Sequence, residues 1–157
     1  MHVRPLAATD RAWLDFTVPE RWGAPTVAGH GRLYTVADLP GFVALDGEER
    51  IGFVTYAIEG RACEMVTIDS LREGSGVGTA LVEAVVRAAR DASCDRVWLV
   101  TTNDNLPMLR FAQKRGFVLV SVQPDAVEEA RKLKPEIPLQ GIEGIPIRDE
   151  LELELRL

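Results

Sequence analysis

Residues 64–92 read EMVTIDSLREGSGVGTALVEAVVRAARDA and contain the transition that decides the fold. Glu64–Ile68 is rich in β-branched and apolar side chains, which predicts a strand. From Leu81 to Ala92 the apolar side chains recur on one helical face and the charged ones on the other, which predicts an amphipathic helix. A glycine-rich turn over residues 72–80 joins the two. The stretch therefore predicts a strand, a tight turn and a helix in direct succession.

The glycine-rich turn is placed where an anion could bind. The first amide N–H groups of a helix have no intrahelical partner, and the helix dipole adds positive potential there. Gly74, Gly76 and Gly78 would let an anion approach the backbone closely, so the predicted ligand is a phosphate or pyrophosphate. The turn has no lysine for a G-x-x-x-x-G-K-[ST] loop, and it does not match G-x-G-x-x-G. The alternative is a turn that only connects the strand to the helix.

Strand patterns also precede this stretch. Three strands are predicted to form an antiparallel meander, at residues 42–45, 51–58 and 64–68. Residues 8–16 predict a helix that follows a short first strand and ends before Pro19. Residues 18–41 show no clear pattern.

Four elements are predicted after the amphipathic helix: a strand at 96–101, a helix at 105–114, a strand at 117–122 and a short helix at 126–133. The first of these strands is apolar along its length, as expected for a strand covered on both faces. At the C-terminal end, residues 151–157 alternate leucine with charged residues, which predicts a half-buried strand. Residues 134–146 are punctuated by proline and glycine. They fit either a lid, a substrate wall or a subunit contact, or an irregular loop that caps the core.

Composition and charge exclude several classes of protein. The chain has 157 residues, with 18 lysines and arginines against 24 aspartates and glutamates, so its net charge is −6. That length suits one domain with its own core, and the acidic balance argues against nucleic acid and anionic membranes and favours a cationic partner. Cys63, Cys94, His2 and His30 cannot form a metal cluster or a disulfide framework, so no metal is expected. No leader-like or membrane-spanning apolar run is present, which indicates a cytoplasmic protein.

Two motifs at a characteristic separation carry a family resemblance. The turn around Gly76–Gly78 resembles R/Q-x-x-G-x-G/A, and Asn105 to Phe117 reads NLPMLRFAQKRGF, which resembles N-x-x-A-x-x-[LF]-Y-x-x-x-G-F. Together they resemble the GNAT superfamily of acetyl-CoA-dependent N-acetyltransferases, with agreement over roughly residues 42–123. The resemblance implies an α+β fold with a mixed, mostly antiparallel central sheet flanked by helices. It also implies that residues 1–157 form a single domain.

The resemblance implies an activity and a cosubstrate. Acetyl-CoA would donate its acetyl group to a primary amine, of a small molecule or a peptide, by direct attack in a ternary complex. Backbone amides of the turn would hold the pyrophosphate, and the pantetheine arm would pair with the preceding strand. The residues implied in donor binding are Met65, Val66, Thr67, Ile68, Glu73, Gly74, Ser75, Gly76, Val77, Gly78, Thr79 and Asn105. Asn105 also suits a helix N-cap, and the two roles are compatible.

The chain departs from the family patterns at two positions. Glu73 stands where the first pattern has arginine or glutamine, and Arg72 comes one residue early. Because backbone amides make most of the phosphate contacts, this departure does not overturn the assignment. Ala112 stands where many members carry a tyrosine that protonates the departing thiolate, so this chain cannot use that group. Tyr34 and Tyr56 are the only tyrosines, and the acid stays unassigned.

Glu64 is the predicted general base. An alkylammonium acceptor must lose a proton before it can attack, and the family often takes its base from this strand. Alternation along the strand predicts that Glu64 shares a face with Val66 and Ile68. Its alternative role is a solvated carboxylate near the strand start, and Glu59 is the second choice for the base. The basic residues within 110–115 could meet the adenosine phosphate or form a solvated helix face.

Two further interpretations stay open. One is a domain that binds acetyl-CoA without catalysis and acts as a sensor or interaction module, which the alanine at position 112 favours. The other is a scaffold that forms a homodimer through residues 137–147.

Overall fold

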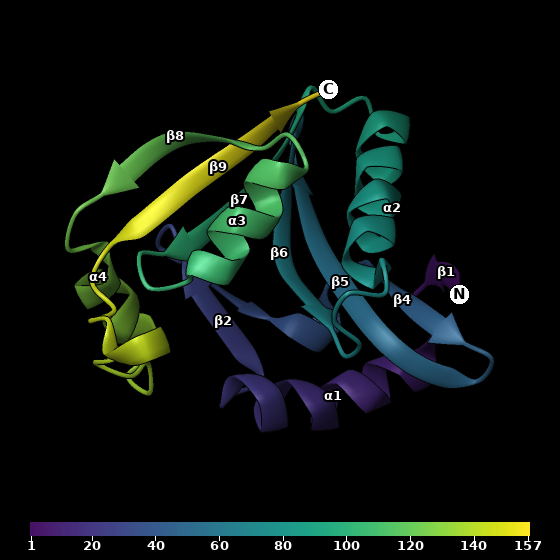
Figure 1. The fold of residues 1–157 in the computed structure, drawn as a ribbon, viewed down its shortest axis with the longest axis horizontal. Helices are drawn as coiled ribbons and strands as arrows, with labels where there is room; N and C mark the ends of the chain where they lie inside the picture. Colours follow the sequence, from purple (N-terminus) through teal and green to yellow (C-terminus); the bar gives the residue numbers. More distant parts are fainter.

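A computed structural model describes all 157 residues and places a seven-stranded sheet at the centre of the molecule (Figure 1). The strands, in their order across the sheet, are β1 (His2–Pro5), β4 (Gly41–Asp46), β5 (Glu49–Glu59), β6 (Ala62–Ser70), β7 (Arg96–Thr102), β9 (Glu150–Arg156) and β8 (Val118–Gln123). Neighbouring strands are antiparallel except β6 and β7, which are parallel and are connected through α2 (Val77–Asp91). The predicted α+β fold with a mostly antiparallel sheet is confirmed.

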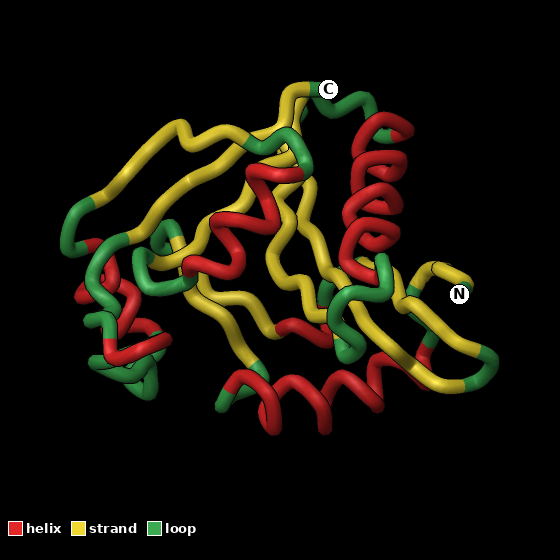
Figure 2. Tube along the Cα trace, viewed as in Figure 1, coloured by secondary structure: helices red, strands yellow, loops and turns green.

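Helices and a small hairpin surround the strands (Figure 2). These elements are α1 (Ala8–Trp22), β2 (Thr26–Gly29), β3 (Arg32–Thr35), the 3₁₀ helix η1 (Val36–Asp38), α3 (Leu106–Lys114), α4 (Ala126–Leu133) and the 3₁₀ helix η2 (Ile142–Gly144). α2 and α3 pack on one face of the sheet, and α1 packs on the other. None of the helices combines the length and the apolar character needed to cross a membrane.

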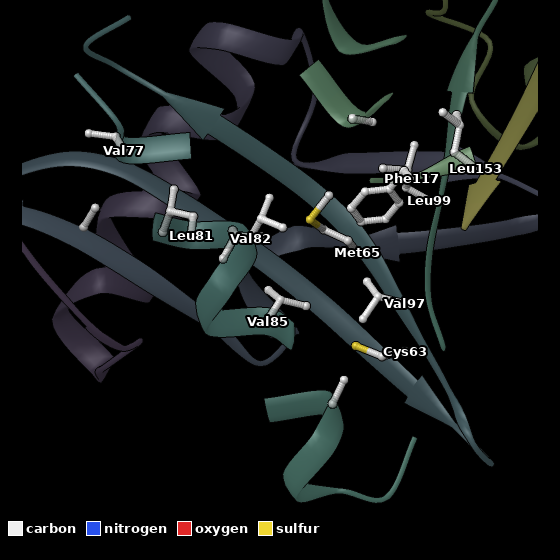
Figure 3. Packing of buried hydrophobic residues seen from close by; sticks show 14 of the residues in the cluster. Cys63, Met65, Val77, Leu81, Val82, Val85, Val97, Leu99, Phe117 and Leu153 are labelled. Carbon is white, nitrogen blue, oxygen red and sulfur yellow. The ribbon is translucent and has the colours of Figure 1, made fainter. Parts of the chain in front are cut away.

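The main core lies between α2 and the sheet (Figure 3). Leu81 and Val85 from α2 pack with Met65 of β6 and Val97 of β7, and Phe117 extends the cluster toward α3. All five side chains are at most 5% exposed. The apolar face predicted for this helix therefore faces the sheet, which fixes the position of the glycine-rich turn at its N-terminus.

α1 is longer than its predicted range. It runs through Pro19 to Trp22, where Gly23 ends it with a φ of 83°. Pro19 lies in the last turn, where its missing N–H removes only one helical hydrogen bond. Leu14 and Val18 are buried against the sheet, so packing holds the C-terminal half of the helix in place.

The region without a sequence pattern, residues 18–41, contains the β2–β3 hairpin. Its two turn residues, His30 and Gly31, have φ values of 51° and 73°. Positive values at both positions define a type I′ turn, for which Asn-Gly is the usual signal. Because a histidine occupies the first position, the sequence gives no such signal.

β9 differs from the half-buried strand that was predicted. Leu153 is fully buried on one face, but Glu154 on the other face is also only 9% exposed. Arg96 donates hydrogen bonds to Glu152 and Glu154 at 3.2 and 2.9 Å, and the ring of His30 lies 3.0 Å from Glu152. The carboxylate face is covered because Arg96 and the β2–β3 hairpin lie over it.

Candidate active site

β6 and β7 are paired over only part of their length. Three residue pairs join them, the last between Glu64 and Trp98. A bulge at Val66 interrupts the register between β6 and β5, and from Met65 onward β6 has no partner on its β7 side. β7 itself stays in register with β9 as far as Thr102. The sheet therefore has a gap at its middle, bordered by backbone N–H and C=O groups of β6 that no strand pairs.

The glycine-rich turn connects the end of β6 to α2. Gly74 and Gly76 have φ values of 71° and 81°, which glycine adopts without strain. Glycine is required at position 78 for a different reason, namely close packing, because a Cβ there would lie 2.7 Å from Cε2 of Phe111 in α3. No side chain caps the N-terminus of α2. Its first amide groups are therefore left for solvent or a ligand.

A first cleft, of about 640 Å³, lies between the end of β6, the turn and α3. The residues implied in donor binding that line it are Ile68, Glu73, Gly74, Gly76, Val77, Gly78 and Asn105. The side chains of Met65 and Thr67 are instead buried, at 4% and 2% exposed, and only that of Met65 belongs to the main core. Thr67 also shares a 2.6 Å hydrogen bond with Thr55. Only the backbone of these two residues is open to a ligand.

The basic residues in α3 and at its C-cap differ in whether their charges are free to bind a ligand. Arg110 and Lys114 line the first cleft, and neither forms an ion pair. Arg115 is engaged, because its Nη2 donates to Oγ1 of Thr79 at 2.7 Å and its guanidinium lies 3.6 Å from the ring centroid of Phe111. The side chain of Thr79 thus joins the start of α2 to the end of α3. Arg110 and Lys114 are the free cations of this cleft.

Arg72 shapes the turn, but its charge is already paired. Its guanidinium meets the carboxylates of Asp46 and Glu49, each at 2.5 Å. Its carbonyl oxygen accepts a hydrogen bond from the Ser75 hydroxyl at 2.6 Å. Glu73 is exposed and makes no hydrogen bond through its side chain. Backbone amides, and not the Arg72 guanidinium, are the groups in this turn that are open to an anion.

A second cleft, of about 360 Å³, adjoins the first. Asn105 lines both clefts, Glu64 and Val66 line the second, and Ile68 lines the first. The other walls come from the end of α1, the β2–β3 hairpin, β7 and residues 134–147, and their apolar side chains include Val27, Val100, Ile137 and Ile147. The two clefts therefore meet along β6, beside the gap in the sheet.

The prediction that Glu64 and Ile68 share a strand face is wrong, because the bulge at Val66 reverses the alternation of side chains along β6. Ile68 packs against the main core together with Met65, whereas Glu64 lies on the other face of the strand.

Glu64 is buried rather than solvated, with 8% of it exposed. The hydroxyl of Tyr34 in β3 donates a hydrogen bond to its Oε2 at 2.9 Å. Burial raises the pKa of Glu64, and the Tyr34 hydrogen bond and the charges of Arg32 and His30 offset only part of this effect. A raised pKa suits a carboxylate that takes a proton from an amine. Glu59, the second choice, is exposed, pairs with Arg32 and lines neither cleft.

The contact between Tyr34 and Glu64 was not predicted from the sequence. Tyr34 lies in the region that had no pattern, and the two residues are 30 positions apart, so no local signal links them. Burial raises the pKa of the Tyr34 hydroxyl, which stays protonated and donates. Tyr56 instead stacks on Phe42, with 5.9 Å between ring centroids and 22° between ring planes. It lines neither cleft.

Lys134, which was also not predicted as a site residue, is the only cation that lines the second cleft. It is 9% exposed, and its Nζ donates a hydrogen bond to the carbonyl oxygen of Thr26 at 2.7 Å. Burial lowers the pKa of Lys134, and the charge of Glu136 opposes this effect. No residue pattern around position 134 indicates a buried lysine.

α3 contributes an amide but no acid to the clefts. Asn105 is its N-cap, with Oδ1 accepting from the N–H of Met108 at 3.2 Å. Ala112 is fully buried in the main core and lines neither cleft. The position that carries a tyrosine in the family pattern therefore offers no proton donor here.

The segment 134–147 is held as a wall of the second cleft. Nδ2 of Asn103 donates to the carbonyl oxygen of Pro146 at 2.9 Å, and Oδ2 of Asp104 accepts from the N–H of Ile142 at 3.1 Å. These contacts fasten the segment to the loop before α3. Of the roles predicted for this segment, which were a lid, a substrate wall, a subunit contact or a capping loop, its geometry fits a wall of the second cleft.

Comparisons with known proteins agree with this architecture. The model of the acetyltransferase (GNAT) family matches residues 8–117. The uncharacterized protein YdhI of Bacillus subtilis (strain 168) is 45% identical over 133 residues, which are 84% of this chain and 83% of the relative. An IAA acetyltransferase from Bacillus cereus ATCC 14579 superposes with a TM-score of 0.74 at 22% identity, over 99% of each chain. A GNAT family acetyltransferase from Elizabethkingia anophelis with acetyl-CoA bound superposes with a TM-score of 0.71 at 16% identity, over 99% of this chain and 97% of that one. The chain therefore belongs to the acetyltransferase (GNAT) family and is an acyltransferase.

Proposed function

We propose that residues 1–157 act as one N-acetyltransferase domain, which moves an acetyl group from acetyl-CoA to a primary amine by direct attack in a ternary complex. The observation that carries this proposal is the meeting of two clefts beside β6, with Asn105 lining both and the buried Glu64 in the second. A donor in the first cleft and an acceptor in the second would meet at the unpaired edge of β6. The acetyl-CoA bound to the Elizabethkingia anophelis structure supports the choice of cosubstrate.

The first cleft would hold the donor mainly through its backbone. The pyrophosphate would bind the amides of residues 74–79, where the positive φ of Gly74 and Gly76 turns those groups around the anion. The pantetheine arm would pair with Met65–Ile68 like an added strand, since that edge has no partner. Arg110 and Lys114 would offset the phosphate charge in a chain whose net charge is −6.

The second cleft would hold the amine, with Glu64 as general base. Glu64 takes a proton from the bound ammonium, and the neutral nitrogen attacks the thioester carbonyl carbon. The C–N bond forms, and a backbone N–H of β6 stabilises the oxyanion. The C–S bond then breaks, and the second proton lost by nitrogen reaches the departing thiolate through solvent, because position 112 offers no acid. The products are an N-acetyl amide and coenzyme A.

An acetyl-CoA turnover screen tests this proposal. Amines, amino acids, polyamines and peptides with free N-termini are each incubated with the enzyme and acetyl-CoA, and the free thiol of coenzyme A is measured. We expect thiol release with at least one class of amine, together with an acetylated product of the matching mass. Binding of acetyl-CoA without turnover of any amine would favour a sensor over an enzyme. Failure to bind coenzyme A would contradict both.

We also propose that the chain forms a homodimer through the sheet edge at β8. The apolar side chains on this edge strand, Val118, Leu119, Val120 and Val122, are 46% to 56% exposed. A second β8 paired with the first would satisfy the backbone groups that this edge leaves unpaired, place the apolar side chains of the two strands side by side and continue the sheet. The other surface considered, residues 137–147, exposes Leu139 but also forms the wall of the second cleft. Light scattering should give twice the chain mass of 17.3 kDa, and a mass of one chain would contradict the dimer.

A further inference from the structure

Lys134 is a buried cation without a carboxylate partner. Its Nζ makes one hydrogen bond, to the carbonyl oxygen of Thr26 at 2.7 Å. Since an ammonium group has three N–H donors, two of them have no protein acceptor. The other charged groups that line the second cleft are Glu64, which accepts from Tyr34, and Glu136, which is exposed.

This arrangement is exceptional within the chain. Lys134 is the only lysine or arginine among the buried residues. Burial of an ammonium group is costly unless an anion accompanies it, because water no longer solvates the charge. Arg96, which is less buried, meets both Glu152 and Glu154. The fold thus supplies a cation in the second cleft without its anion, and a bound ligand could supply that anion.

We propose that the acceptor is a primary amine that also carries a carboxylate, namely a free amino acid, and that Lys134 binds the carboxylate. This inference rests on the proposed acetyl transfer and names its substrate class. The amine would face Glu64, the carboxylate would face Lys134, and an apolar side chain would contact Val27 and Val100. The cleft of about 360 Å³ suits one amino acid better than a longer peptide. The reaction itself is unchanged, with a C–N bond formed, a C–S bond broken and a proton passed to Glu64.

The hydrogen bond to Thr26 gives Lys134 a structural role as well, since it joins the end of α4 to β2. A purely structural lysine would affect stability and all acceptors alike. A lysine that binds a carboxylate would change the discrimination between amines that carry this group and amines that lack it. The ratio of kcat/KM between amines with and without a carboxylate therefore distinguishes the two roles.

The first test needs no variant. kcat/KM is measured for phenylalanine, phenylalaninamide and 2-phenylethylamine, and for leucine and 3-methylbutylamine. Within each set, only the amino acid carries a carboxylate. Rates are compared per concentration of neutral amine, because these substituents alter the amine pKa. We expect the amino acids to be preferred by at least about tenfold, as is typical for a hydrogen bond to a charged group. Equal or faster acetylation of the amines without a carboxylate would overturn the inference and leave the acetyl transfer established.

The second test compares Lys134→Met with Lys132→Met. Methionine keeps an apolar stem and removes the charge in both variants, and Lys132 is an exposed residue whose Nζ pairs with Glu129 at 2.8 Å. We expect Lys134→Met to raise the KM for phenylalanine. The ratio of kcat/KM for an amino acid to kcat/KM for the amine without a carboxylate should fall close to one. Lys132→Met should keep the preference of the unchanged enzyme, and Lys134→Arg should retain a preference of the same sign. A preference that survives in Lys134→Met would overturn the inference.

Calorimetry provides a readout that does not depend on turnover. Phenylalanine and 2-phenylethylamine are each titrated into the complex of the enzyme with coenzyme A. We expect phenylalanine to bind with measurable heat and 2-phenylethylamine to bind more weakly. If Lys134→Met fails to fold, Lys134→Gln takes its place, and the two ligand comparisons on the unchanged enzyme still decide the question. If no amine is acetylated at all, the proposed function fails, whereas binding of phenylalanine at Lys134 can still be confirmed or contradicted by the titration.

Discussion

The two clefts of this acyltransferase are built in different ways. The first is lined by two continuous segments, residues 68–78 and 105–115, and the glycines and backbone amides of the turn after β6 border its space. The second is assembled from side chains, and its polar groups Tyr34, Glu64 and Lys134 come from three distant parts of the chain. A binding site for a common donor can thus be local and made of backbone. A site for a particular acceptor depends on side chains that only the complete fold brings together.

The largest expected effect lies in the second cleft, at Glu64. Glu64→Gln preserves the shape of the side chain and removes the base, so kcat should fall by about 10² to 10⁴. The loss should be greatest above the pKa of Glu64, where the carboxylate is ionised, and should shrink below it, because Glu64 is then protonated in the unchanged enzyme as well. The affinity for acetyl-CoA should change little. Thiol release measured across pH, together with acetyl-CoA titration, checks both statements.

Glu59→Gln is the companion to this variant, because Glu59 was the other candidate base and its side chain is 71% exposed. A loss of turnover in Glu59→Gln with normal turnover in Glu64→Gln would move the base from the second cleft to the surface.

The next effect tests whether the first cleft binds its ligand through backbone. Gly76→Glu would place a side chain and a negative charge beside the amides of the turn, and we expect at least about a hundredfold loss of acetyl-CoA affinity. Gly60→Glu is the matched control, because Gly60 also has a positive φ, of 59°, and open space around it, but lies away from the first cleft. Calorimetry measures the acetyl-CoA affinity of both variants. Unchanged affinity in Gly76→Glu would show that the turn only connects β6 to α2.

Tyr34→Phe should shift a pH profile rather than abolish activity. The hydrogen bond from Tyr34 stabilises the Glu64 carboxylate, so its removal raises the pKa of Glu64 further. Glu64 acts as a base only above its pKa, and the acid limb of kcat should therefore move upward by about one pH unit. Tyr56→Phe is the control, since Tyr56 lines neither cleft, and it should leave the profile in place. If the unchanged enzyme, Tyr34→Phe and Tyr56→Phe have identical pH profiles, Tyr34 does not influence the pKa of Glu64.

The smallest effects are expected from the charged side chains of the first cleft. Arg110→Met and Lys114→Met should each raise the KM for acetyl-CoA by about two- to fivefold, because exposed charges contribute little in water. The increase should fade in high salt, which screens such charges. Arg87→Met, an exposed change on α2, serves as the control. A hundredfold increase in the KM for acetyl-CoA in either variant would mean that side chains, and not the backbone, dominate donor binding.

Much of the fold could be predicted because its elements follow local patterns. The meander, the amphipathic helix and the alternating β9 are each visible within a few residues, and Gly76 and Gly116 mark element ends. The β2–β3 hairpin could not be predicted, since its strands have four residues each and His30 occupies a turn position that usually carries asparagine. The covered face of β9 depends on Arg96, which is distant in sequence.

The candidate site divides in the same way. The turn and Asn105 could be named from motifs, although the need for Gly78 comes from contact with Phe111, which no motif specifies. Tyr34 and Lys134 could not be named, because their significance depends on Glu64 and on a shared cleft. The backbone groups of the first cleft and one side chain of the second, Glu64, were therefore predictable from the sequence.

A crystal structure of the enzyme with acetyl-CoA tests the central claim most directly, because that claim places a donor and an acceptor in two clefts that meet at β6. We predict that the pyrophosphate will lie on the amides of residues 74–79, that the pantetheine arm will pair with Met65–Ile68, and that the acetyl group will reach the boundary between the clefts near Glu64. A donor bound elsewhere, or an acetyl group directed away from the second cleft, would contradict the account.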